Sequence, residues 1–281
     1  MEQTLEQHAE LDYLKVTAPA VAGELHLHEF QSEIYRNQRY LRVWLPPGYD
    51  DEANQNRNYP VFYLNDGQNL FEPTTAFGGV DWQVDDAADR LIREGVVPPM
   101  IIVGIDNTGS DRLREYVPCR MMRPPVLRPG GKRYPDFLIE EVMPFIEQRY
   151  RIAPEAKNTG LGGSSLGGAI TLYTVIRRPG VFGRVLIESP SLFIGNKRLL
   201  RLSRKLRQWP ERIVIAIGSQ ECGREDADRR TVENVKELER IIRASQLGPD
   251  RLAVNIVEGA SHAESEWAKR FPDSLAFLFG N

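Results

Sequence analysis

The stretch 158-NTGLGGSSLGG-168 holds five glycines and runs directly into the apolar segment 169-AITLYTVIRR-178. Glycine costs about 0.5 to 1 kcal/mol against alanine inside regular structure, so this density needs a geometric reason. Gly163-Ser164-Ser165-Leu166-Gly167 fits G-x-S-x-G, in which a strand turns sharply into a helix and the serine hydroxyl is exposed at the corner. Small residues on either side let the two backbones approach closely. We therefore expect a nucleophilic elbow with Ser165 at its apex.

A glycine-rich turn or a phosphate-binding loop is the alternative interpretation of this stretch. In a G-x-G-x-x-G loop that starts at Gly160 and Gly162, the third glycine would fall at Ser165. No G-K-[ST] triplet follows either. The pattern therefore favours the elbow over a nucleotide site.

Short, continuous apolar runs surround the elbow, as is typical of strands that are covered on both faces. They are 59-YPVFYL-64, 99-PMIIVGI-105, 184-RVLIES-189, 212-RIVIAIG-218 and 251-RLAVNIV-257. Helix-like segments alternate with them at 80–93, 134–150, 167–178, 226–245 and 263–279. Before them, 24–35 and 39–49 alternate apolar and polar residues and predict an antiparallel hairpin. These patterns predict an α/β fold: a mostly parallel sheet with antiparallel N-terminal strands and helices on both faces.

Length and charge limit the class of protein. The chain has 281 residues, 41% of them hydrophobic, which suits one domain at 25–281 after an N-terminal extension at 1–24. The net charge of -3 provides no basic field to attract nucleic acid or an anionic membrane. Cys119 and Cys222 lack the spacing of a disulfide framework or a zinc site.

The first residues, 1-MEQTLEQHAELDYLKV-16, are acidic and polar, unlike a secretory signal. No apolar run approaches the roughly 18 residues of a membrane span. We expect a cytoplasmic protein that acts on a small molecule, without a nucleic-acid or membrane partner, and of unknown oligomeric state.

A serine nucleophile needs a base that is itself oriented by a carboxylate, in the chain order Ser, Asp or Glu, His. His262 follows the last predicted strand, and the other histidines, His8, His26 and His28, precede the elbow. The loop 219-SQECGREDADRR-230 offers the acid. We prefer Glu221 because it comes first after the strand, whereas Asp226 and Asp228 also suit the acidic first turn of the next helix.

Backbone N–H groups should complete the site as an oxyanion hole. Leu166 would contribute one donor at the start of its helix, and Gln68, after the turn at Gly67, would contribute the second. Three aromatic residues, Phe71, Trp82 and Tyr116, are candidates to line a substrate pocket, with Phe77 beside them. Plain core packing is the alternative for these side chains.

The stretch 116-YVPCRMMRPPVLRPGGKRYP-135 is the long irregular segment of the chain. It could be a lid over the site or a solvated loop. Its cations could attract an anionic acyl group or simply be solvated; they are Arg120, Arg123, Arg128, Lys132 and Arg133.

From about Leu25 onward the chain resembles the putative esterase family of the α/β-hydrolase superfamily, which includes enterochelin esterases, esterase D-like S-formylglutathione hydrolases, feruloyl and acetylxylan esterases, and mycolyltransferases. The resemblance lies in "RVWLPPGYD", "YPVFYLNDGQNLFEP", "DRLREYVP", "GGSSLGG", "SPSLF" and "HAESEWAKRFPDSLAFLFG". It implies the α/β-hydrolase fold, with Ser165 as nucleophile, His262 as base and Glu221, in "GSQE", as acid. Relatives often have His where Asn65 stands, and some have a Ser-His dyad.

The expected activity is therefore that of a serine carboxylic-ester hydrolase that forms an acyl-enzyme and needs no metal or organic cofactor. Short-acyl or aromatic esters, of the carbohydrate or siderophore type, are the expected substrates. Acyl transfer by the same triad is an alternative. A non-catalytic interaction protein with this fold is a further alternative, although all three triad positions are filled.

Overall fold

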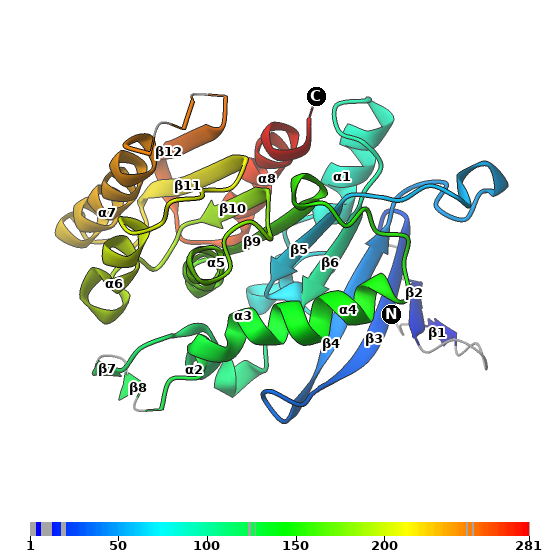
Figure 1. The fold of residues 1–281 in the computed structure, drawn as a ribbon, viewed down its shortest axis with the longest axis horizontal. Helices are drawn as coiled ribbons and strands as arrows, with labels where there is room; N and C mark the ends of the chain where they lie inside the picture. Colours follow the sequence, from blue (N-terminus) through cyan, green and yellow to red (C-terminus); the bar gives the residue numbers. More distant parts are fainter. Residues whose placement is uncertain are drawn as a thin grey trace.

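The computed structural model describes residues 4–6, 13–17, 21–122, 125–126, 128–245, 247–248 and 250–280. Within them, a ten-stranded sheet crosses the molecule in the order β1-β2-β3-β4-β6-β5-β9-β10-β11-β12 (Figure 1). Its strands are β1 (Thr4–Glu6), β2 (Leu14–Thr17), β3 (Glu24–Ser32), β4 (Asn37–Leu45), β5 (Val61–Asn65), β6 (Ile101–Ile105), β9 (Thr159–Ser164), β10 (Arg184–Glu188), β11 (Arg212–Gln220) and β12 (Leu252–Ser261). A separate small hairpin pairs β7 (Met121–Met122) with β8 (Pro125–Val126).

Helices connect most of these strands. They are α1 (Val84–Arg93), α2 (Arg112–Tyr116), α3 (Tyr134–Asp136), α4 (Met143–Glu147), α5 (Leu166–Arg177), α6 (Ile194–Ser203), α7 (Glu225–Arg243) and α8 (Glu264–Phe279). A π-helical segment, Phe137–Val142, joins α3 to α4.

The strands from β6 to β12 in the sheet order run parallel to one another, and β1 to β4 add an antiparallel edge. The expected hairpin pairs Glu24 with Leu45 at one end and Ser32 with Asn37 at the other. The predicted α/β fold, mostly parallel with antiparallel N-terminal strands, is thus confirmed. Residues of the N-terminal extension also join the sheet, because β2 pairs with β3 and β1 with β2.

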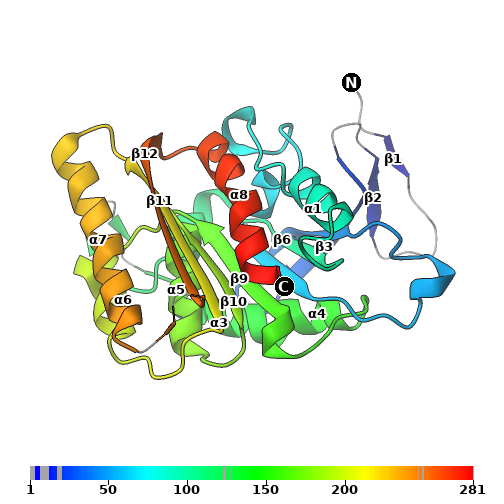
Figure 2. The ribbon, with the colours of Figure 1, turned by 90° about the horizontal axis from the view of Figure 1, so that it is seen from above.

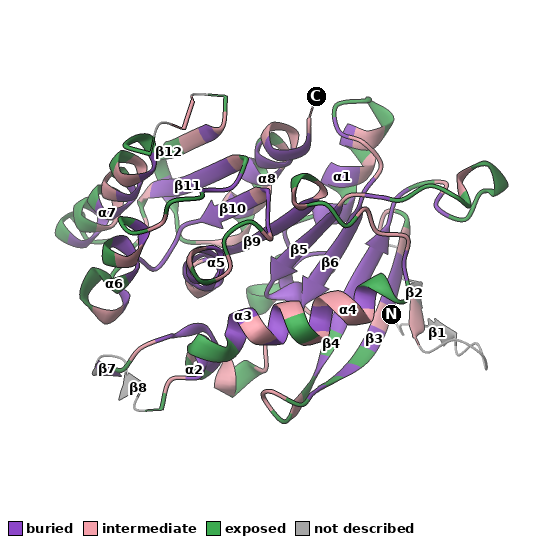
Figure 3. Cartoon of the chain, in the orientation of Figure 1, coloured by how far each residue is buried: buried purple, intermediate pink, exposed green. Residues whose placement is uncertain are grey.

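Helices cover both faces of the sheet (Figure 2). Side chains of α1 and α8 pack on one face, in a core with Phe62, Leu64 and Leu186. Helices α5, α6 and α7 and the α3–α4 segment cover the other face, where Tyr63 and Leu161 belong to the core. All residues of β5, β6 and β9 are buried, and the sheet interior is correspondingly purple in Figure 3. Because helices cover both faces of the sheet, the sequences of these strands are continuous apolar runs.

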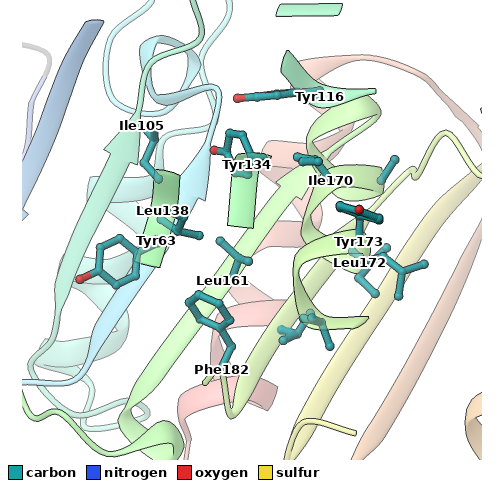
Figure 4. Packing of buried hydrophobic residues seen from close by; sticks show 14 of the residues in the cluster. Tyr63, Ile105, Tyr116, Tyr134, Leu138, Leu161, Ile170, Leu172, Tyr173 and Phe182 are labelled. Atoms are coloured by element: carbon teal, nitrogen blue, oxygen red, sulfur yellow. The ribbon is translucent and has the colours of Figure 1, made fainter. Parts of the chain in front are cut away.

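The hydrophobic core on the α5 face of the sheet holds the turn between β9 and α5 in place. In Figure 4, Ile170, Leu172 and Tyr173 project from α5, Leu161 lies on β9, and Tyr134 stands beside Tyr116. The rings of Tyr116 and Tyr134 meet edge to face with centroids 5.3 Å apart. Such packing leaves little freedom for the strand–turn–helix unit that carries Ser165.

Several element boundaries differ from the expectation. Helix α1 begins at Val84, four positions later than expected, because Gln83 has a left-handed φ of 52°. The helix expected at 134–150 contains the π-helical turn. Helix α6 was not predicted, and the structure shows left-handed backbone angles at residues 195–197 near its start.

The segment at 116–135 is partly regular and attached to the body. Gly130 N–H donates to the carbonyl of Arg114 at 2.8 Å, and Gly131 N–H to that of Val117 at 3.1 Å. The β7–β8 hairpin lies between these points. Arg123 is outside the described residues.

Candidate active site

The turn between β9 and α5 places Ser165 at φ 56° and ψ -117°. A residue other than glycine pays about 1 to 3 kcal/mol for such a conformation, which occurs mainly at functional sites. The backbone around it is well bonded: Ser165 N–H donates to the carbonyl of Glu188 at 2.9 Å, and Ser191 N–H donates to the carbonyl of Ser165 at 3.0 Å. The surrounding hydrogen bonds therefore hold the strained turn.

Close backbone approach explains the glycines of the elbow. A Cβ on Gly163 would lie 2.9 Å from Cβ of Asn65 and 3.0 Å from the carbonyl carbon of Gly167. A Cβ on Gly167 would lie 2.9 Å from Oδ2 of Asp66. Both positions need the smallest residue, as expected from the sequence.

Asn65, at the end of β5, ties the two halves of the elbow together. Its amide nitrogen lies 3.1 Å from the carbonyl oxygen of Gly162, 3.2 Å from that of Gly167 and 2.9 Å from the hydroxyl of Thr171. The hydroxyl of Tyr134 donates to its Oδ1. In this chain the buried amide of Asn65 thus links β9 to α5 at the turn that carries Ser165.

His262 follows β12 and is hydrogen-bonded through Nδ1 to Oε2 of Glu221. The Glu221 side chain is only 2% exposed, whereas that of His262 is 34% exposed. Oε1 of Glu221 accepts hydrogen bonds from the N–H of Gly218 at 2.7 Å and from the hydroxyl of Ser189 at 2.8 Å. A carboxylate at Nδ1 fixes the tautomer that leaves Nε2 free to accept a proton.

Burial acts to raise the pKa of Glu221. The hydrogen bond and charge of His262, followed by the N–H of Gly218 and the hydroxyl of Ser189, outweigh it and hold this pKa below its usual value. Glu221 is therefore ionised at neutral pH. An ionised acid is the form that orients and stabilises a protonated imidazole.

The other two acid candidates have different partners. Asp226 is exposed and pairs with Arg229, one turn along α7. Asp228 accepts a hydrogen bond from the N–H of Cys222 at 2.5 Å. Of the three, the structure brings only Glu221 to His262.

Ser165 and His262 line one cavity of about 540 Å³. Its other lining residues are Asp66, Gln68, Asn69, Thr75, Phe77, Asn107, Gly109, Arg112, Ser164, Glu264 and Trp267. A larger hollow of about 660 Å³ lies between the α2–β7 connection and the start of α6, and Arg120, Lys132 and Arg198 line it. It contains none of the three triad candidates.

The loop after β5 carries Gln68 in a short helical turn, Gly67–Asn69. The preceding Asp66 is left-handed with φ 63°. Its carboxylate is held by Arg112 through bonds of 2.7 and 2.8 Å and by the amide of Asn107 at 2.7 Å. The first N–H groups of a helix have no partner within it, which suits Gln68 and Leu166 to the oxyanion role expected of them.

Two of the aromatic candidates, Phe71 and Trp82, are 1% and 3% exposed and belong to the core. Tyr116 is fully buried, and its hydroxyl accepts a hydrogen bond of 3.3 Å from the N–H of Asp66. The structure therefore corrects their expected place: they support the site from beneath and do not line its cavity. The aromatic lining comes from Phe77 and Trp267.

Sequence reasoning missed Trp267, Ser189 and Arg112. Trp267 lies one turn into α8, with its ring edge-on to His262 at a centroid distance of 4.9 Å. Its Nε1 donates to the hydroxyl of Ser189 at 3.0 Å. Ser189 stands in "SPSLF" and Trp267 in "HAESEW". The family resemblance of these two blocks is the signal that could have pointed to them, although it assigns neither side chain a role.

The remaining histidines are structural where the structure describes them. His26 and His28 bond the hydroxyl of Tyr150 at 2.8 and 2.6 Å, and His8 lies outside the described residues. Within the described part of the chain, no group of three or more His, Cys, Asp or Glu side chains could hold a metal ion. No helix among the same residues is both long and apolar enough to cross a membrane.

Residues 32–278 match the family described as "Putative esterase". The chain belongs to this family. It is therefore a carboxylic ester hydrolase with the α/β-hydrolase fold. The match spans both the elbow and His262, so it covers all the elements that form the site.

Similar proteins include YbbA of Bacillus subtilis, which is uncharacterized and 25% identical over 89% of this chain and 96% of its own. The ferri-bacillibactin esterase BesA of the same organism is 28% identical over 68% of this chain and 69% of its own. An iron(III) enterobactin esterase of Dickeya dadantii is 29% identical over 75% of this chain, which spans 46% of that longer protein.

Solved structures show the same fold. The BES protein of Bacillus cereus superposes with a TM-score of 0.72 at 21% identity, over 94% of this chain and 99% of that one. The siderophore hydrolase EstB of Aspergillus nidulans superposes with a TM-score of 0.70 at 18% identity, over 92% of this chain and 96% of that one. At these identities the likeness concerns the fold alone.

Proposed function

We propose that this esterase is a serine hydrolase that works through a triad of Ser165, His262 and Glu221. His262 removes the proton of the Ser165 hydroxyl as its oxygen attacks the ester carbonyl. The same imidazole then gives the proton to the leaving alcohol. Water repeats the sequence on the acyl-enzyme and releases the acid.

The observation that carries this proposal is the hydrogen bond between Glu221 and His262 at the cavity that Ser165 lines. Ionised Glu221 would stabilise the imidazolium that forms in each half-reaction. The strained backbone at Ser165 supports the nucleophilic role, because such strain is concentrated at functional sites.

The N–H groups of Gln68 and Leu166 are proposed to hold the oxyanion. Both stand at the first turn of a helical segment, and Gln68 lines the cavity. The network of Asp66, Arg112 and Asn107 supports this role because it immobilises the Gln68 turn in advance. Preorganised donors of this kind usually supply the largest single catalytic effect.

Esters with short acyl or aromatic groups are the proposed substrates. A cavity of about 540 Å³ lies within the usual range of about 300 to 1,000 Å³ for small-molecule sites. Phe77 and Trp267 offer aromatic surface beside polar groups such as Asn107. Relatives named for bacillibactin and enterobactin make siderophore esters the first natural class to test.

The test uses purified protein, a fluorophosphonate probe and p-nitrophenyl acetate. We expect the probe to modify Ser165 and not its neighbour Ser164, as located by peptide mass spectrometry. Ser165→Ala should lower kcat by about 10⁴-fold or more while the protein stays folded. Hydrolysis at the parent rate by folded Ser165→Ala protein would refute the mechanism. A panel of acetyl, butyryl, feruloyl and siderophore-lactone esters then ranks the substrates by kcat/KM.

A further inference from the structure

Residues 188–191, which begin with the last residue of β10, contact both the nucleophile and the acid. The carbonyl of Glu188 accepts from Ser165 N–H at 2.9 Å, and Ser191 N–H donates to the carbonyl of Ser165 at 3.0 Å. Between these two, Ser189 N–H donates to the carbonyl of Ala216 on β11 at 2.7 Å. Since β11 leads to Glu221, this short segment connects the elbow to the strand that carries the acid.

The hydroxyl of Ser189, a residue only 2% exposed, lies among four polar groups. Its oxygen is 2.8 Å from Oε1 of Glu221 and 3.2 Å from Oε1 of Glu188. Nε1 of Trp267 donates to it at 3.0 Å, and a guanidinium nitrogen of Arg270 lies at 3.5 Å. Trp and Arg can only donate, so the single hydroxyl proton is available for one carboxylate.

Glu221 is the better acceptor for that proton. Its contact with the hydroxyl is the shorter one, and Glu188 already has a buried cation, because Arg270 donates to its Oε1 at 2.7 Å. Burial raises the pKa of Glu188 while Arg270 acts to lower it. Among the described residues, the further donors to Glu221 are His262 and the Gly218 N–H.

The backbone of Ser189 is also unusual. Its φ is 39°, in the left-handed region that a residue with a Cβ rarely adopts. Glycine would fit this conformation at lower cost, yet it would lack the hydroxyl. A strained serine at a bend that touches the acid points to a use for its side chain.

We propose that Ser189 is a positioning residue of the triad, whose hydroxyl holds Oε1 of Glu221 so that Oε2 faces Nδ1 of His262. Trp267 fixes the rotation of that hydroxyl by occupying its acceptor side. Helix α8 thereby contributes to the orientation of an acid that it does not carry. This inference rests on the proposed triad.

The test compares Ser189→Ala and Ser189→Gly with the parent enzyme on p-nitrophenyl acetate. A lost hydrogen bond to a charged group should lower kcat by about ten- to a hundredfold, with KM changed by less than about threefold. Glycine relieves the positive φ and removes the same hydroxyl, so Ser189→Gly should melt no lower than Ser189→Ala and lose as much activity. Parent kcat in both variants would overturn the proposal.

Ser274→Ala is the matched control. Ser274 is 1% exposed, and its hydroxyl bonds only the carbonyl of Arg270 within α8, among the contacts of the described residues. Its loss should leave kcat unchanged. An equal fall in kcat for this variant would show that any buried serine near α8 matters, and would overturn a specific role for Ser189.

A double-mutant cycle separates positioning from general destabilisation. In a Glu221→Ala background, Ser189→Ala should lower the residual kcat by less than about twofold, because the group that it holds is gone. The full single-variant loss in that background would overturn the proposal. A parent enzyme that neither hydrolyses esters nor depends on Ser165 would instead refute the proposed function, so the two failures are distinguishable.

The protonation of Glu221 gives an independent readout. The charged and titratable groups around Glu221 are His262, Glu188 and Arg270. Removing the Ser189 hydroxyl takes away one of the groups that lower the pKa of Glu221. The pKa of Glu221, read from the NMR shift of its side-chain carboxyl carbon as pH is varied, should therefore be higher in Ser189→Ala than in the parent and unchanged in Ser274→Ala. A Glu221 pKa unmoved in Ser189→Ala would count against the proposal.

Discussion

Glu221 and His262 lie 41 positions apart in the sequence and are joined by a hydrogen bond between Oε2 and Nδ1. The ends of β11 and β12 bring them together, where the register shifts between Gly218 and Gln220. A Cβ on Gly218 would lie 2.1 Å from the carbonyl oxygen of Ala260, so only glycine lets the two strands approach this closely. The N–H of Gly218 then binds Glu221. One glycine thus sets both the spacing of the strands and the position of the acid.

Replacing Glu221 by Gln should lower kcat by about 10³- to 10⁴-fold with little change in KM. Glutamine keeps the shape of the side chain but loses the charge that stabilises imidazolium. Steady-state kinetics on p-nitrophenyl acetate measures the effect. Asp226→Asn is the control, and it should retain parent activity because Asp226 is exposed and pairs with Arg229. The reverse result would assign the acid to α7.

The sequence predicted the parallel strands well, because burial on both faces leaves continuous apolar runs such as 101–105. It also predicted which acid would reach His262, since Glu221 stands first after its strand. These successes depend on local pattern and chain order. The catalytic roles of Ser165, His262 and Glu221 stay predictions until the variants are measured.

The sequence did not predict features that depend on tertiary packing. Phe71 and Trp82 stand in the loop after β5 and were expected at the cavity. The loop instead places both side chains in the core that includes residues of α8. The ring centroids of Trp82 and Trp267 lie 5.7 Å apart. Trp267 was expected only as part of a helix, although it borders the cavity. Residue type alone could not decide which aromatic rings face the substrate.

Gly67→Ala should disable the oxyanion loop. The added Cβ would lie 2.5 Å from the carbonyl carbon of Gly104 and 2.7 Å from the nitrogen of Ile105, both backbone atoms of β6. Because that strand cannot yield, the turn that carries Gln68 must move, and kcat should fall by about 10²- to 10³-fold. Gly130→Ala is the control, since its Cβ would meet no atom closer than 3.4 Å. Activity within twofold of the parent in Gly67→Ala would contradict the assignment of this loop.

Asp85→Asn should stabilise the protein most at high pH. Asp85 is 1% exposed and accepts a bond of 2.6 Å from Ala22 N–H, and burial raises its pKa from 3.8 to about 7. Between these values the unfolded chain loses the proton and the folded chain keeps it, so this contribution to stability falls as pH rises to about 7. The melting temperature of the variant minus that of the parent should therefore increase between pH 4 and pH 8.

The exposed Asp86, in the same helical turn, provides the comparison for Asp85. Asp86→Asn should show a much smaller change in this difference, because water solvates its carboxylate. Melting curves at four or five pH values suffice. A difference for Asp85→Asn that is flat with pH would mean that its carboxyl ionises normally in the folded protein.

Ser165→Gly should melt at a higher temperature than Ser165→Ala, although both variants lose activity. The backbone at Ser165, with φ 56° and ψ -117°, costs a residue with a Cβ about 1 to 3 kcal/mol. Glycine avoids most of this conformational cost. It also loses about 0.5 to 1 kcal/mol of stability, because it has more conformational freedom in the unfolded chain. In a chain of this size each kcal/mol shifts the melting temperature by about 2 to 4 °C. Ser274, inside α8, supplies the opposite case, since Ser274→Gly should melt lower than Ser274→Ala. If both pairs of variants rank alanine above glycine, the elbow stores no strain, and its serine conformation then gives no support to a nucleophilic role.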